Sequence, residues 1–279
     1  MDSVKILVPA TTANLGPGYD CLGVAFQIYN HATITRSDAT LASSPMAEEA
    51  AGHFFAQAGV EPFGFDWRVT GDVPRSRGLG SSVTVRLGLL HGMNELSGTP
   101  LNTSQLFEIC AVLEGHPDNA APATFGGFTV AGGSAVARFE VAPQLHFVLL
   151  VPDFEISTPE ARRVLPTNID RLGAVRSAGN ACRITAAFAT GDYSLLEGAF
   201  EDHLHQPYRE KELIPFLQHV IAAGVKAGAI GGFLSGSGST ICCVTLHHPE
   251  AVAHAMHAAS GHAARTIITT ADNTGARVA

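Results

Sequence analysis

The chain has 279 residues, of which 46% are hydrophobic and 15% are charged, and its formal charge is −8 at neutral pH. This length fits one large domain or two medium ones, and the apolar content is enough for a sizeable core, which excludes an intrinsically disordered chain. The negative charge, with arginines scattered along the chain, argues against nucleic acid as a partner.

The five cysteines lack Cys-x-x-Cys spacing. This favours reduced, mostly buried thiols over a disulfide framework or a zinc ribbon. The first residues do not have the pattern of a signal peptide, and no apolar run approaches the roughly 18 residues that would span a membrane. We therefore expect a soluble, cytoplasmic protein without a membrane partner.

The first predicted element is a short strand over residues 4–8, which Pro9 should end. The next stretch, residues 10–23, is rich in Gly, Pro, Asn and Thr and is predicted to be a loop. Loops just beyond a strand often carry substrate contacts, and Asn14 and Asp20 are the candidates here. The alternative is a connecting turn in which both side chains make only local hydrogen bonds.

A glycine-rich turn between a strand and a helix is the first candidate for ligand binding. The pattern predicts strands over residues 24–28, 32–35 and 65–70, a short helix over 46–57, and a helix over 83–96. Immediately before that helix lie Arg77, Gly78, Leu79, Gly80, Ser81 and Ser82. Glycine lets a ligand approach the backbone, and a helix N-terminus offers free N–H groups to phosphate. The turn fits neither the Walker loop nor the dinucleotide fingerprint, and a tight turn with a serine cap is the alternative.

A polar loop at residues 114–119 is the second candidate. The apolar periodicity of residues 106–113 predicts a helix that cannot continue through Pro117. The loop holds Glu114, His116, Asp118 and Asn119 between apolar flanks. A carboxylate beside a hydroxyl from another loop is a common Mg²⁺ site, because this ion prefers oxygen ligands. A solvated helix end is the alternative.

The second half of the chain is predicted to be mixed α/β. We expect strands at residues 125–130 and 146–151 with a turn at 132–134, helices at 172–190, 193–200 and about 214–227, a strand at 241–246, a helix at 249–258, and short strands at 266–269 and 276–278. We place a domain boundary near residue 144, which gives an N-terminal domain, 1–144, and a C-terminal domain, 145–279.

Two arginines and a second glycine-rich stretch are the candidates of this half. Arg183 and Arg209 are either ordinary surface arginines or a clamp for a carboxylate through their forked guanidinium groups. The small residues of the stretch 231–240 would let a phosphate or another loop come close. A tight hairpin is the alternative for this stretch.

Three of these segments resemble the three motifs of the GHMP kinase superfamily, and in particular those of homoserine kinases. They are residues 9–23, the loop Gly78–Ser82, and residues 234–238. Further segments similar to homoserine kinase signatures are residues 114–127, 157–162 and 205–209. The resemblance therefore runs along nearly the whole chain.

The resemblance implies an α+β, two-domain fold. Its N-terminal ATP-binding domain would be like domain 2 of ribosomal protein S5, and its C-terminal domain would be ferredoxin-like. It implies phosphorylation by ATP, with Mg²⁺, of the side-chain hydroxyl of L-homoserine to O-phospho-L-homoserine, a step of threonine biosynthesis. Two alternatives stay open, which are a kinase for another small hydroxylated amino acid or alcohol and a catalytically silent binding protein of this fold. A homodimer is the common default for a soluble enzyme.

The resemblance also implies roles for individual residues. Ser82 and Glu114 would ligate Mg²⁺. The ATP phosphates would be bound by Arg77, Gly78, Leu79, Gly80, Ser81, Ser82, Ser235, Gly236 and Ser237. The amino acid would be surrounded by Asn14, Asp20, His116, Arg183 and Arg209. Phosphoryl transfer depends on alignment and charge neutralisation more than on a strong base, so the expected catalytic residues, Asp118, Asn119 and Arg183, would position the reacting groups.

The sequence departs from the homoserine kinase pattern in three places. The region after Thr35 is shortened, and the asparagine-containing segment that lies near the nucleotide base has no counterpart before Met46. The run Val83-Thr84-Val85-Arg86 replaces an alanine-rich start of the phosphate helix, and Ser239 stands where the third motif usually has proline.

Overall fold

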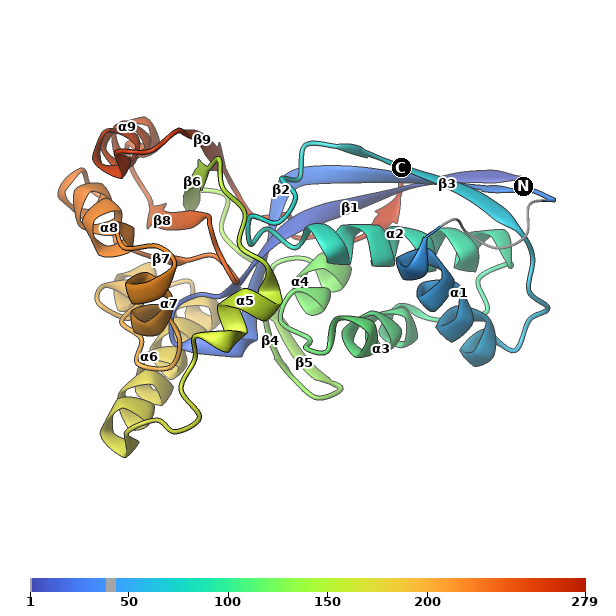
Figure 1. Ribbon diagram of the computed structural model, residues 1–279, viewed down its shortest axis with the longest axis horizontal. Helices are drawn as coiled ribbons and strands as arrows, with labels where there is room; N and C mark the ends of the chain where they lie inside the picture. Colours follow the sequence, from blue (N-terminus) through green and yellow to red (C-terminus); the bar gives the residue numbers. More distant parts are fainter. Residues whose placement is uncertain (1, 39–43) are drawn as a thin grey trace.

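Two antiparallel sheets form the framework of the protein, which we describe from a computed structural model covering residues 2–38 and 44–279 (Figure 1). The first sheet has six strands in the order β10-β1-β2-β4-β5, with β3 also paired to β2. The second has four strands in the order β7-β8-β6-β9. Within the described residues, no helix combines the length and apolar character needed to cross a membrane.

The first sheet and its helices make up the N-terminal half. The strands are β1 (Ser3–Asn14), β2 (Gly18–Arg36), β3 (Phe65–Gly71), β4 (Phe128–Gly132), β5 (Ala135–Phe139) and β10 (Arg277–Val278). The helices are α1 (Pro45–Ala58), α2 (Ser81–Leu96), α3 (Thr103–Glu114) and α4 (Ala120–Phe125). Alternate apolar side chains of β1 and β2, such as Ile6 and Ile34, pack against Leu87 and Leu90 of α2. This packing fixes the start of α2 beside the sheet, where the candidate phosphate loop lies (Figure 1).

Helices α8 (Leu217–Lys226) and α9 (Pro249–Ser260) pack on one face of the second sheet, and the other face belongs to a core that it shares with the first sheet and α6 (Arg171–Thr190). The strands of this sheet are β6 (His146–Pro152), β7 (Gly231–Leu234), β8 (Ile241–Thr245) and β9 (Ala264–Thr269). The other helices of this half are α5 (Thr158–Arg163) and α7 (Gln206–Glu212), with a 3₁₀ turn at Tyr193–Leu196. Successive residues of β6 alternate between two cores, because side chains of a strand point to opposite faces.

One of these cores joins the two halves of the protein. Phe26 of β2 and Phe128 of β4 belong to the same buried cluster as Phe147 of β6 and Phe188 of α6. The Phe128 and Phe188 rings stack with their centroids 4.2 Å apart. The predicted domain boundary near residue 144 falls in the connection between β5 and β6 and stays a prediction, while the last strand, β10, returns to β1.

The prediction of a loop over residues 10–23 is wrong. β1 continues through Pro9 to Asn14 and β2 begins at Gly18, so that the connecting turn is very short. Pro9 is tolerated because the register between the two strands shifts at Pro9 and Ala10, and such bulges are places where a sheet accepts proline. The two strands predicted at 24–28 and 32–35 are likewise one long strand.

Most of the other predicted elements are confirmed within a few residues. The helix predicted over residues 193–200 is only a short 3₁₀ turn, and four short elements were not predicted, namely α4, β5, α5 and α7. The stretch 231–240 is a hairpin between β7 and β8, as its alternative interpretation had it. Helices of six or seven residues contain too few apolar repeats to be seen in the sequence.

Candidate active site

The glycine-rich turn forms the entrance to α2. Gly80 is the N-cap residue in the left-handed conformation, with φ at 66°, and no side chain caps the helix within the described residues. A Cβ atom on Gly78 would lie 2.1 Å from the carbonyl oxygen of Ser235, and one on Gly80 would lie 2.1 Å from Oγ1 of Thr11. Only glycine allows this close approach. The uncapped N–H groups and the positive end of the helix dipole make the turn suitable for phosphate.

The second glycine-rich hairpin packs directly against this turn. Ser235 donates its hydroxyl to the carbonyl of Gly78 at 2.7 Å, and its Oγ lies 2.8 Å from Oγ1 of Thr12. Asn14 donates from Nδ2 to the carbonyl of Gly236 at 3.0 Å. The three segments that carry the motifs, far apart in the sequence, therefore meet at one place.

A pocket of about 250 Å³ lies where these segments meet. It is lined by most of the residues predicted for the site: Asn14, Asp20, Gly78, Leu79, Gly80, Ser81, Ser82, Glu114, His116, Asp118, Asn119, Arg209, Gly236 and Ser237. Residues of α5 and its N-cap, among them Ser157, Thr158 and Arg162, complete the wall. Residues of both halves of the protein therefore line this single pocket.

Two predicted phosphate-binding residues have structural partners instead of facing this pocket. Arg77 donates from Nε to the carbonyl of Pro152 at 2.8 Å and pairs with Glu155 at 3.2 Å. Its guanidinium therefore joins the glycine turn to the end of β6. The hydroxyl of Ser235 is engaged with Gly78 and Thr12, as described above. Their predicted contacts with ATP stay predictions.

The ion end of the pocket, as we name the site formed by Ser82 and Glu114, offers two oxygen atoms. Ser82 donates its hydroxyl to Oε2 of Glu114 at 2.8 Å, and Arg86 donates from Nη1 to Oε1 of the same carboxylate at 2.8 Å. A serine hydroxyl and a carboxylate beside free backbone N–H groups fit a Mg²⁺ ion that shares its other ligands with phosphates and water. The donor set therefore fits the ion implied by the resemblance.

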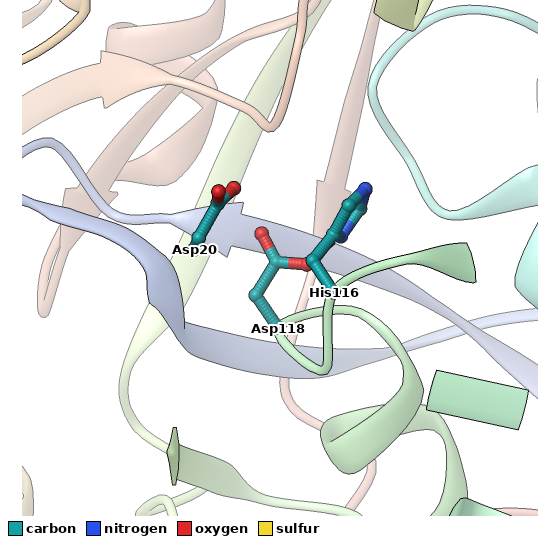
Figure 2. Close-up of side chains that lie close together, drawn as sticks. All are labelled: Asp20, His116 and Asp118. Atoms are coloured by element: carbon teal, nitrogen blue, oxygen red, sulfur yellow. The ribbon is translucent and has the colours of Figure 1, made fainter. Parts of the chain in front are cut away.

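The other end of the pocket, which we name the acceptor end, is formed by Asp20, His116 and Asp118 together with Arg162 and Arg209. Figure 2 shows Asp20 on β2 facing Asp118, with the His116 ring beside them on the loop that follows α3. Each of the three offers one atom within 4.8 Å of the others. The hydrogen bond from His116 to Asp118, 2.6 Å long, raises the pKa of His116, although burial opposes it. Two carboxylates this close suit a positively charged ligand group.

Arg162 of α5 faces the carboxylate of Asp20. Its Nη2 donates to both Asp20 oxygens, at 2.8 and 3.0 Å, and its guanidinium lies over the Tyr19 ring. Asp20 raises the pKa of Arg162, although burial opposes it. The backbone of Asp20 adopts a left-handed conformation, with φ at 57°, and its N–H donates to Oδ1 of Asn14 at 3.0 Å. The turn between β1 and β2 therefore holds Asp20 toward α5.

Arg209 of α7 is buried behind the acceptor end. It donates from Nη1 to the carbonyl of Gly236 at 2.8 Å and from Nε to the carbonyl of Ala161 at 3.2 Å. Its Nη1 also lies 3.1 Å from Nδ1 of His205, whose Nε2 lies 2.7 Å from the carbonyl of Gly16. Burial lowers the pKa of His205 to about 4, so the ring is neutral near pH 7, with Nε2 as donor and Nδ1 as acceptor.

The position expected for Arg183 has to be corrected. It lies on the exposed side of α6, donates to the carbonyl of Glu197 at 2.7 Å, and is outside the lining of the pocket. Among the described residues, Arg162 and Arg209 are the arginines that line the pocket. A signal for Arg162 was present in the sequence, since residues 157–162 belong to a segment similar to a homoserine kinase signature and end on this arginine.

A larger cavity, of about 660 Å³, lies on the far side of α7 between α8 and β7. Its walls are mainly apolar side chains such as Phe200, Ile221 and Leu246. It contains neither the glycine turn nor the ion end, so its size does not make it the site of phosphoryl chemistry.

The shortened segment after Thr35, where the sequence departs from the homoserine kinase pattern, lies partly in residues 39–43, outside the described residues.

Comparison with protein families identifies both halves of the chain. Residues 45–127 match the family described as GHMP kinases N terminal domain, and residues 184–262 match the one described as GHMP kinases C terminal. A homoserine kinase of Microchaete diplosiphon is 40% identical over 93% of this chain and 91% of its own length. One from Clostridium botulinum (strain Eklund 17B / Type B) is 38% identical over 86% of each chain.

Solved structures give the same result. The crystal structure of a homoserine kinase from Cytophaga hutchinsonii is 26% identical and superposes with a TM-score of 0.91, covering 100% of this chain and 98% of that one. A mevalonate kinase of Methanococcus jannaschii, at 13% identity, shares the fold with a TM-score of 0.73 over 96% and 98% of the two chains. The predicted α+β, two-domain GHMP kinase fold is confirmed.

Proposed function

The chain belongs to the GHMP kinases and, within them, to the homoserine kinases, and from this premise we propose that its pocket transfers the γ-phosphoryl group of ATP to the side-chain hydroxyl of L-homoserine. The product is O-phospho-L-homoserine, an intermediate of threonine biosynthesis. The observation that carries the proposal is the joining of two unlike ends in one pocket of about 250 Å³. A phosphate turn with an ion site faces a set of groups suited to an amino acid.

The phosphates of ATP would lie at the start of α2. The backbone N–H groups of Gly80, Ser81 and Ser82 would bind the phosphate oxygens, aided by the helix dipole. Ser82 and Glu114 would hold Mg²⁺, which when bound supplies charge neutralisation between the phosphates. The Gly236 and Ser237 turn closes the pocket from the second half of the protein.

The amino acid would lie at the acceptor end. The carboxylate of Asp20 suits its ammonium group, and the guanidinium groups of Arg162 and Arg209 suit its carboxylate. Binding would replace part of the contact between Arg162 and Asp20, because both have to turn toward the substrate. Asn14 supports Asp20 through its hydrogen bond to the Asp20 N–H.

Asp118 and Asn119 would align the hydroxyl with the γ-phosphate. Asp118 is buried, and its Oδ1 accepts hydrogen bonds from the N–H of Asn119 and from His116. These bonds fix the orientation of the carboxylate. Thr11 donates to Oδ1 of Asn119 at 2.7 Å, which leaves the amide nitrogen facing Asp118. Alignment rather than a strong base then accounts for the reaction.

A substrate panel tests the proposal. ADP release is measured in a coupled assay with homoserine, serine, threonine and simple alcohols, and nucleotide binding is measured with and without Mg²⁺. We expect homoserine to give the highest kcat/KM, because it fills both the ammonium and the carboxylate sites. A higher value for an uncharged alcohol would exclude the amino-acid assignment. Nucleotide binding without any turnover would instead identify a silent member of the family.

We also propose that the protein works in the cytoplasm as a homodimer, without a nucleic-acid or membrane partner. The support is general, since most soluble oligomers are symmetric homo-oligomers and the formal charge of −8 disfavours nucleic acid. Sedimentation equilibrium over a concentration series checks the dimer. A mass equal to that of one chain at every concentration would contradict it.

A further inference from the structure

A guanidinium lies against the carboxylate of the ion end, on the side away from the serine. Arg86 follows Ser82 by one turn of α2, so both side chains project from the same face of the helix toward the end of α3. There Ser82 holds Oε2 of Glu114 and Arg86 holds Oε1, each at 2.8 Å. One face of α2 therefore fixes both oxygens of this carboxylate.

Because the Glu114 carboxylate is largely buried, it needs the positive charge of Arg86 when no ligand is bound. The Glu114 side chain is 9% exposed and that of Arg86 is 15% exposed. A carboxylate removed from water to this extent is costly unless a positive group compensates it. Arg86 also reaches Glu49 of α1 at 3.1 Å, but the Glu49 side chain is 50% exposed and water can solvate it. Glu114 therefore depends on Arg86 more than Glu49 does.

We propose that Arg86 is the counter-ion of Glu114 in the nucleotide-free protein, and that it makes entry of the divalent ion depend on the nucleotide. This inference rests on the proposed function, because it concerns the same ion site. A guanidinium bonded to one carboxylate oxygen places a positive charge close to any cation that approaches the other oxygen, and like charges at such distances repel strongly in a partly buried site. Free ions therefore bind weakly.

The triphosphate changes this balance. Its negative charges enter at the start of α2, on the side of Glu114 that faces the glycine turn, and attract the ion more strongly than Arg86 repels it. Arg86 meanwhile keeps Oε1 occupied, so that Glu114 presents Oε2 to the ion. Arg86 is in this way a positioning residue, which acts through Glu114 and touches neither substrate.

The test measures ion binding without nucleotide or amino acid. Arg86→Met removes the charge but keeps the apolar stem, Arg86→Lys retains a positive charge, and Arg176→Met on the exposed side of α6 is the matched control. Binding of Mn²⁺ is followed by the loss of the free-ion EPR signal, and the Tm is measured over a series of Mg²⁺ concentrations. Arg86→Gln is a second variant in case Arg86→Met does not fold.

We expect Arg86→Met to bind free Mn²⁺ at least about ten-fold more tightly than the wild-type protein. Its Tm should be lower without Mg²⁺ and should rise as Mg²⁺ is added, because the ion replaces the lost counter-ion. Wild type, Arg86→Lys and Arg176→Met should show neither effect. The double variant Arg86→Met with Glu114→Gln should lose the gain in ion binding, which assigns the effect to this carboxylate.

Three results would overturn the proposal. They are equal Mn²⁺ affinity in wild type and Arg86→Met, a gain that persists in the double variant, and a lowered Tm in Arg86→Met that Mg²⁺ does not restore. The last result would mean that Arg86 only joins α1, α2 and α3. Because neither ATP nor homoserine is present, a wild-type protein that does not phosphorylate homoserine would refute the proposed function and leave the ion result unaffected.

Discussion

The two ends of the pocket differ in where their residues come from and in how their charges are balanced. At the ion end, Ser82, Arg86 and Glu114 belong to two helices of the N-terminal half, and one carboxylate faces one guanidinium. At the acceptor end, Asp20 belongs to the N-terminal half and Arg162 to the second half. The ion end is thus complete within one half of the protein, whereas the acceptor end exists only where the halves meet.

This difference leads to different expected kinetics. In the proposed reaction, groups at the ion end would act on the charge that moves during phosphoryl transfer, so their loss should reduce turnover. Groups at the acceptor end would hold the substrate equally before and during the reaction, so their loss should mainly raise the KM for the amino acid. A substitution at the ion end that mainly raised the KM for the amino acid, or one at the acceptor end that mainly reduced turnover, would contradict this distinction.

The largest effect is expected for Glu114→Gln. It removes the charge that would hold the ion in the proposed reaction, and loss of one such electrostatic group costs roughly 10²–10³-fold in kcat. The KM for homoserine should change little, because the acceptor end is intact. Steady-state kinetics at saturating Mg²⁺ measure both constants. Glu108→Gln, on the exposed side of the same helix, is the control. A raised KM for homoserine with unchanged kcat would assign Glu114 to substrate binding at the acceptor end and contradict its role at the ion end.

Asn119→Ala should have the next largest effect, because Asn119 lies between the two ends. Its amide is oriented by the hydroxyl of Thr11 and by Asp118. Misalignment of reacting groups can cost on the order of 10²-fold in turnover. Affinity for ATP, measured by calorimetry, should change far less than kcat. Thr11→Val, which removes only the orienting hydroxyl, should give a smaller loss in the same direction, and an unchanged kcat in Asn119→Ala would refute its role.

Arg162→Ala and Arg183→Ala form a matched pair at the acceptor end. A charged hydrogen bond to a substrate carboxylate contributes about 1.5–3 kcal/mol, so Arg162→Ala should raise the KM for homoserine by tens-fold or more. The KM for ATP should stay the same. Arg183→Ala should leave both constants within about two-fold, because Arg183 contacts the backbone of Glu197 outside the pocket. The opposite ranking would restore Arg183 as a substrate-binding residue.

The same comparison explains what the sequence could predict of the site. Ser82 and Glu114 each lie at the end of a long helix with clear apolar periodicity, and the motif itself starts at a visible glycine turn. Arg162 lies on a helix of six residues, and its partner Asp20 is 142 positions away in the sequence. Without the resemblance, nothing in the chain would have distinguished the pocket arginines from surface ones.

The fold, too, could be predicted from the sequence only in part. The glycines, prolines and threonines of residues 10–23 read as a loop, but antiparallel pairing of β1 with β2 gives their backbone groups partners and overrides local preference. The bulge at Pro9 is a tertiary feature, since it depends on the register of the opposite strand. Long helices and buried strands were predicted because their signal is repeated over many residues.

The smallest effect is expected in the pH dependence of stability, and it arises behind the acceptor end. His205 is fully buried between Gly16 and Arg209, and its pKa is lowered to about 4. In the unfolded chain a histidine has a pKa of about 6.5, so between these values the unfolded state binds the proton and the folded state does not. Stability must therefore fall as the pH is lowered from 7 toward 4.

Between pH 7 and pH 5 this histidine should cost about 1–2 kcal/mol of unfolding free energy. Urea unfolding at the two pH values measures the loss, and His205→Gln should remove most of it. His116 provides the contrast, because its hydrogen bond to Asp118 raises its pKa. The stability that protonated His116 gives to the folded state is complete below pH 6.5 and is lost as the pH rises through the folded-state pKa. His116→Gln should therefore leave the loss between pH 7 and 5 in place, and a loss that disappears in this variant would mean that the acid response arises at the rim of the pocket and not behind it.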